Sequence, residues 1–143
     1  MDYGVVARGS LVLRRPGDLA ERVVGAPRES EAQRIVAQSV PPAARLVTFQ
    51  TQGETAAALL ANQAEAVVIA RQGARDLLTR NPNSGMAYKF TLGSRWLGAA
   101  IRFGEHDLLR AVNLLLFTMR EDGRLAAIPE KYGHRLPGPL PVL

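Results

Sequence analysis

The sequence predicts an α/β fold, a three-layer sandwich with a mainly parallel sheet. Three times in succession a short apolar run, beginning at Val23, Leu46 and Ala66, is followed by a helical pattern. Such alternation is typical of strand–helix units around a parallel sheet. The third run, 66–70, is continuous and β-branched in its middle, as expected of a strand covered on both faces. The 143 residues, 47% hydrophobic and 22% charged, suit one ordinary domain.

The first two strands are each followed by a helix-capping signal. A strand over 23–26 precedes Ser30 and Gln33, which have the spacing of a capping box. A strand over 46–49 precedes Thr51 and Glu54, which repeat that spacing. Asn62 is expected to end the second helix, because asparagine tolerates left-handed backbone. The third helix is indicated by apolar residues at helical spacing, namely Ala74, Leu77 and Leu78.

The rest of the sequence, from about residue 79, predicts two strands and two helices. After a loop over 81–85, which is rich in turn-forming residues, strands are predicted over 88–90 and 97–101. A long helix follows Gly104 and ends at Gly123, and a shorter one covers 124–132. The proline-rich segment 136–141 is expected to have no regular structure. The long helix carries an apolar stripe of Leu108, Leu109, Val112, Leu115, Leu116 and Met119.

The composition argues against several classes of function. The net charge is +5, but the arginines are scattered and no basic–aromatic clusters occur, so no nucleic-acid partner is expected. The chain has no cysteine and no glycine-rich phosphate loop, and His106 and His134 lack neighbouring metal ligands. We therefore predict no catalytic residue, no metal, no cofactor and no enzyme activity. No apolar run approaches the ~18 residues that a membrane helix requires, so the chain is not expected to span a membrane.

Five segments of the chain, in order, resemble the extracellular solute-binding proteins of polar amino-acid ABC transporters. These are 16–25, 54–68, 97–104, 108–113 and 122–133, and the last carries DGRLAAI followed by KYG. The resemblance implies the type II periplasmic-binding-protein fold, in which two α/β lobes joined by two crossing strands enclose a ligand. On this basis 1–96 would be the second lobe, with the first crossing within Val5 to Leu13. Residues 97–143 would be the return crossing strand and C-terminal helices that pack on a first lobe absent from this chain.

The resemblance also implies a function and partners. We expect the substrate-binding component, whole or truncated, of an ABC importer, which binds an amino acid or related organic anion and docks to the ABC permease. Its location would be periplasmic or extracellular, although the first residues lack the features of a secretory signal. The apolar stripe, without its usual cover, predicts a homodimer through the C-terminal helix. Two alternatives stay open: a ligand-sensing regulatory domain of the same fold, and a degenerate lobe without ligand.

The candidate ligand-binding residues follow the three parallel strands. Open α/β sheets bind ligands at the carboxyl ends of such strands, so the three turns form one predicted surface. In the family the first turn holds the ligand carboxylate; here Glu29 and Glu31 add negative charge beside it. The family has an aspartate for the ligand's ammonium group where this chain has Ala70. Three of the candidates have an alternative role without a ligand. Ser30 and Thr51 could serve only as helix caps, and Arg71 could be a solvated arginine in the first turn of its helix. The candidates are Arg28, Ser30, Gln50, Thr51, Ala70 and Arg71.

Overall fold

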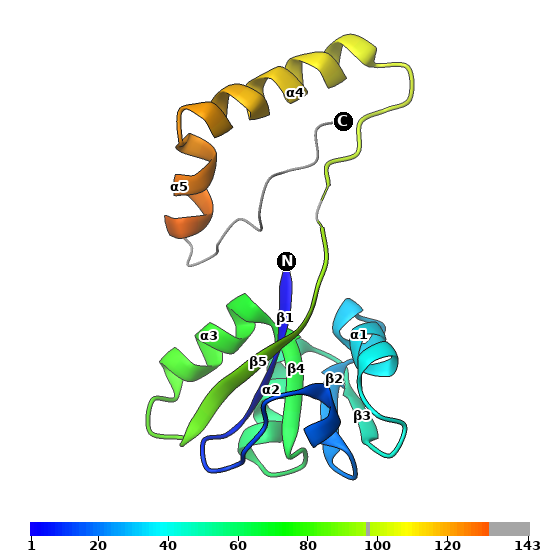
Figure 1. The fold of residues 1–143 in the computed structure, drawn as a ribbon, viewed down its shortest axis with the longest axis vertical. Helices are drawn as coiled ribbons and strands as arrows, with labels where there is room; N and C mark the ends of the chain where they lie inside the picture. The colour runs from blue at the N-terminus through cyan, green and yellow to red at the C-terminus, as the bar shows by residue number, and fades with distance from the viewer. Residues whose placement is uncertain (97, 132–143) are drawn as a thin grey trace. The chain divides into compact units, whose positions relative to one another are not determined.

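The computed structural model describes residues 1–96 and 98–131, and it divides the chain into two compact units. The first unit is Met1–Leu97 and the second is Gly98–Leu143. The predictions for Tyr132, His134 and the segment 136–141 lie outside the described residues. Figure 1 shows the elements of both units, coloured from blue at the N-terminus towards red at the C-terminus.

The first unit is a five-stranded sheet with helices on both faces. The strand order is β3-β2-β4-β1-β5. Strand β2 runs parallel to β3 and β4, and β1 lies antiparallel between β4 and β5. The strands are β1 (Asp2–Arg8), β2 (Val23–Pro27), β3 (Arg45–Phe49), β4 (Ala66–Ala70) and β5 (Met86–Ser94). The helices are a 3-10 turn, η1 (Pro16–Leu19), with α1 (Glu31–Ser39), α2 (Gln52–Leu60) and α3 (Arg71–Arg80).

Two apolar clusters, one on each face of the sheet, form the core. Successive residues of a strand point to opposite faces, and in β4 Val68 joins one cluster while Val67 and Ile69 join the other. The first cluster contains Leu19 of η1 with Ala32 and Val36 of α1. The second contains side chains of α2 and α3, among them Leu59, Ala74 and Leu77. Figure 1 shows α1 and α3 on opposite sides of the sheet. The predicted three-layer α/β fold is confirmed.

The capping signals place the helices that follow β2 and β3. Ser30 Oγ accepts from the amide of Gln33 at 3.2 Å, and Thr51 Oγ1 accepts from the amide of Glu54 at 3.1 Å. Asn62 follows α2 with a positive φ of 60°, as its predicted role requires. The sequence reasoning did not include η1, where the Asp18 carboxylate accepts from the amides of Arg14 and Arg15. The bond from the Arg14 amide is the main cause that lowers the pKa of Asp18.

The second unit contains helices α4 (His106–Glu121) and α5 (Arg124–Lys131). Gly123, with a φ of 80°, separates them, as predicted. Between the two helices the Arg124 guanidinium forms an ion pair of 2.7 Å with the Asp122 carboxylate. This bond holds the pKa of Asp122 below its usual value. Helix α4 has no buried residue. The part of the chain that the structure describes contains no helix both long and apolar enough to cross a membrane.

One expected strand is wrong. Residues 98–101 have no regular secondary structure, and Leu97 is outside the described residues. The sequence there is apolar, but a strand also needs a hydrogen-bonded neighbour, and the sheet pairing ends with Asp2 and Ser94. The strand expected over 88–90 is instead the longer β5, Met86–Ser94, which pairs with the whole of β1.

Candidate functional site

The six candidate residues lie in the three turns at one edge of the sheet. Strands β3, β2 and β4 are neighbours and run parallel, so their carboxyl ends, Phe49, Pro27 and Ala70, meet at that edge. The Arg28 amide donates to Phe49 O at 2.7 Å and so joins the first turn to the second. The remaining strands also reach this edge, because Tyr3 of β1 pairs with Ala70.

In the first turn, the hydroxyl of Ser30 is already engaged. It donates to Pro27 O at 2.6 Å and accepts from the amide of Gln33 at 3.2 Å. The Gln33 side chain accepts in return from the amide of Glu29, the residue before the cap, at 2.7 Å. Ser30 is therefore a helix cap, and a contact with a ligand would be an additional role. The amides of the first helical turn have no partner within the helix, and the exposed Arg28 lies beside them.

The second turn repeats this arrangement. Thr51 caps α2, and the Glu54 carboxylate accepts from the Gln50 amide at 3.0 Å. Both Gln50 and Thr51 are exposed. The side chain of Gln52 lies against α3, because a Cβ added to Gly73 would stand only 1.8 Å from Gln52 Nε2. The second and third turns are thus in contact through Gln52, and the glycine is the signal in the sequence that permits this approach.

The third turn differs, since Ala70 provides no cap. Helix α3 begins without a side-chain hydrogen bond from its capping residue. The exposed Arg71 forms an ion pair of 3.6 Å with Asp2 of β1, and its guanidinium lies 5.6 Å from the centre of the Tyr88 ring. Asp2 also accepts from Ser94 Oγ at 2.8 Å. Arg71 is therefore partly neutralised by the chain itself, so Arg28 is the candidate cation better placed to attract an anion.

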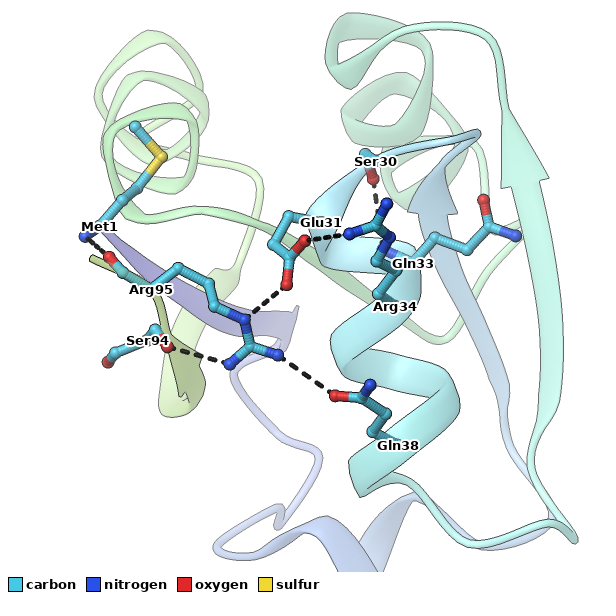
Figure 2. Close-up of polar contacts among 8 residues, drawn as sticks. All are labelled: Met1, Ser30, Glu31, Gln33, Arg34, Gln38, Ser94 and Arg95. Carbon is cyan, nitrogen blue, oxygen red and sulfur yellow. Dashed lines mark hydrogen bonds and ion pairs between the residues drawn. The ribbon is translucent and has the colours of Figure 1, made fainter. Parts of the chain in front are cut away.

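The charge of Glu31 is offset by two arginines, Arg34 and Arg95, and the sequence reasoning included neither of them. Figure 2 shows Arg95, which follows β5, reaching to Glu31 and Gln38 on α1. The ion pairs from Arg95 and Arg34 to the Glu31 carboxylate measure 2.5 Å and 3.4 Å. The negative charge of Glu31 is thus largely compensated, whereas the exposed Glu29 takes no part in these two ion pairs. Arg95 lies 64 positions from Glu31 in the chain, and no local sequence pattern indicates their contact.

The described residues contain no group of three or more His, Cys, Asp or Glu side chains that could hold a metal ion. The candidate residues at this edge instead offer amides, hydroxyls and guanidinium groups, and the neighbouring carboxylates of Asp2, Glu31 and Glu54 are bonded within the chain. Amides, hydroxyls and guanidinium groups donate hydrogen bonds and favour an anionic or polar solute.

The α/β fold of the described chain matches that of type II periplasmic binding proteins among solved structures. Comparison with protein-family models and with curated proteins gives no match. Among solved structures, an ancestral arginine-binding protein bound to glutamine is 25% identical, with a TM-score of 0.69. The same kind of protein bound to arginine is 24% identical, with a TM-score of 0.71. The substrate-binding protein of an amino acid ABC transporter is 16% identical, with a TM-score of 0.68.

All three matches cover 92% of this chain but only 58–59% of the other chain. The chain therefore spans less than two thirds of the length of these proteins. Since the identities are low, the comparisons establish the fold, and the ligands named belong to those proteins.

Proposed function

We propose that this chain binds a small polar solute, an amino acid or related organic anion, as the substrate-binding component of an ABC importer. The observation that carries the proposal is the match over 92% of the chain to an arginine-binding protein bound to glutamine. The neighbouring structures are binding proteins, which favours binding over catalysis. The fold by itself does not fix function, so the proposal depends on the edge described above.

The proposed binding surface comprises the three turns at the carboxyl ends of β2, β3 and β4. Two capped helices, α1 and α2, begin there. The positive ends of helix dipoles and the free amides of first turns favour an anionic group. The exposed side chains of Arg28 and Gln50 are positioned to add a cation and an amide. We assign the ligand contacts to Arg28, Ser30, Gln50, Thr51, Ala70 and Arg71.

Ala70 restricts the kinds of ligand that this surface could bind. The family resemblance implies an acid at this position that pairs with the ligand's ammonium group, and a methyl group cannot form that charge-assisted bond. The arginines of the edge also favour an anion, because Arg28 is exposed and Arg95 is bonded to the Glu31 carboxylate. An organic anion without an ammonium group therefore suits this surface better than an ordinary α-amino acid.

The proposal extends to the arrangement and partners of the chain. We propose that 1–96 act as the second lobe, and that 97–143 carry the return crossing and the helices that meet the other lobe. A protein with this role would work in the periplasm or outside the cell and would dock to the permease of the importer. The shorter length of the chain relative to its structural neighbours is compatible with one lobe and its connections.

The exposed apolar residues of helix α4 favour a further partner, which we propose is a second copy of the chain. Its apolar residues are exposed within the described structure, with Leu108 at 51%, Leu115 at 54% and Phe117 at 58%. Apolar surface of this kind favours association, and two-fold pairs are the commonest form. We propose a homodimer through α4. Light scattering should give twice the chain mass at micromolar concentration, and Leu115→Glu should give the single mass. A wild-type chain that stays monomeric would contradict the dimer.

A thermal-shift screen tests the proposed function. A ligand that binds only the folded state raises the unfolding midpoint, and the rise grows with ligand concentration. We expect organic anions such as succinate to raise it, and polyamines to leave it unchanged because they carry the opposite charge. Arg28→Gln should reduce the rise, whereas Arg80→Gln, at the far end of α3, is the matched control. A screen in which no amino acid or organic acid raises the midpoint would contradict the proposal.

A further inference from the structure

The end of strand β5 is fastened to helix α1. A Cβ added to Gly93 would stand 2.9 Å from Ile35 Cγ2, so the strand passes close to this buried side chain of α1. Just beyond the strand, the Arg95 amide donates to Met1 O at 2.8 Å. The first unit ends two residues later, at Leu97. The chain is therefore held against both β1 and α1 as far as Arg95.

Arg95 uses all three nitrogens of its guanidinium group in this attachment. Its Nε donates to Glu31 Oε1 at 2.5 Å, and its Nη2 donates to Gln38 Oε1 at 3.2 Å. The Nη1 donates to Ser94 O at 3.0 Å, which fixes the side chain to its own strand. Glu31 begins α1 and Gln38 lies near its end, so the guanidinium joins two side chains that are seven residues apart on the helix (Figure 2). A planar group with several donors restrains orientation better than a point charge.

Glu31 makes this contact relevant to the proposed binding surface. It is the first residue of α1, so its carboxylate lies beside the free amides of the first turn. A carboxylate there suits the helix dipole but repels an incoming anion. Arg95 bonds this carboxylate from β5 and Arg34 bonds it from within α1. Each arginine offsets part of the Glu31 charge and so reduces the repulsion between this carboxylate and an incoming anion.

We infer that Arg95 is a positioning residue with two linked effects. It neutralises Glu31 so that the first turn of α1 can accept an anion, and it couples that turn to the segment leading into the second unit. The first effect rests on the proposed function, and the second is independent of any ligand. Movement of the chain beyond Arg95 would then alter the turn, and an anion at the turn would steady the end of β5.

The coupling is tested without ligand by amide hydrogen exchange, followed by NMR, on the wild-type chain and Arg95→Gln. The substitution keeps the backbone bond to Met1 O but removes the charged bonds to α1. We expect exchange of the amides of 93–95 to become roughly fivefold faster, because local opening costs less. Arg34→Gln is the matched control: it removes a bond to the same carboxylate without touching β5, and exchange there should stay unchanged. Unchanged exchange in Arg95→Gln would overturn the coupling.

The charge effect is tested with succinate as the probe, by calorimetric titration. Arg95→Gln should weaken binding roughly two- to fivefold, the scale of a partly exposed ion pair. Glu31→Gln should not weaken it. The double variant Arg95→Gln with Glu31→Gln should bind within about twofold of wild type, because the repelling carboxylate is gone. A purely structural role would leave the double variant as weak as Arg95→Gln, which would overturn the neutralising role.

The two readouts separate failure of the inference from failure of the proposed function. If the wild-type chain binds no succinate, the anion-binding role fails and the neutralising role fails with it. The exchange measurement then still decides the coupling, since faster exchange supports it and unchanged exchange overturns it.

Discussion

Gly25, in the middle of β2, shows how closely the neighbouring strands and the loop before β4 pack. A Cβ at this position would stand 3.1 Å from Phe49 Cε2, 3.1 Å from Val67 Cγ1 and 3.3 Å from Ala64 Cβ. These atoms approach from β3, from β4 and from the loop before β4, and Val67 is fully buried. A buried side chain enclosed in this way has little room to move.

We predict that Gly25→Ala lowers the free energy of unfolding by about 1–3 kcal/mol, the usual cost of adding a methyl group to a packed core. Gly53→Ala is the matched control, because a Cβ there meets only Thr51 Oγ1, at 3.8 Å. That change should raise the free energy of unfolding by about 0.5–1 kcal/mol, since alanine favours helix. Urea denaturation measures both. Equal effects of the two substitutions would show that packing around Gly25 is looser than described.

At the scale of elements, the three helices that follow the parallel strands are not equivalent. Helices α1 and α2 each begin with a side-chain cap, whereas α3 begins at Ala70 without one. Ala70 has a non-helical backbone, with φ −57° and ψ 141°. A capping side chain normally requires backbone of this kind. The position is therefore able to take an acid without a change of fold.

We predict that Ala70→Asp raises the free energy of unfolding by about 0.5–1 kcal/mol, by capping α3. It should also shift the ligand preference from succinate towards α-amino acids, because the carboxylate can bond an ammonium group. Ala70→Asn is the control, since it caps the helix without the charge. Urea denaturation and calorimetric titration with succinate and glutamine give the two readouts. If the Asp and Asn variants show the same preference, Ala70 does not determine the ligand chemistry.

Elements specified by local sequence were predicted well. The caps expected at Ser30 and Thr51 depend on residues within four positions of chain, and the structure has both caps. The reciprocal bonds from Gln33 and Glu54 go to the amides of Glu29 and Gln50, one residue before each cap. The strand expected over 97–101 failed because pairing depends on a distant neighbour, which apolar composition does not reveal. The length of β5 was underestimated for the same reason, since its pairing with β1 extends it to Met86–Ser94.

For the whole first unit, the alternation of strands and helices predicts the class of fold, but not the strand order. The order β3-β2-β4-β1-β5 places the first strand of the chain between β4 and β5. Arg95 follows β5, so its contact with Glu31 of α1 depends on where β5 lies in this order. The two residues are 64 positions apart in the chain, so local sequence does not reveal the contact. The three turns of the candidate surface could be predicted, since parallel strands end at one edge. The compensation of the Glu31 charge by Arg34 and Arg95 could not be predicted from the sequence.

The central claim is that an anionic solute binds at the three turns, and backbone NMR of the chain during a succinate titration tests it most directly. If the claim is right, the amide resonances that move most will be those of 28–32, 50–53 and 70–72. Sodium chloride at the same ionic strength should move them much less, because a specific site is not reproduced by screening. Resonances that stay unchanged, or that move only in other parts of the chain, would contradict the claim.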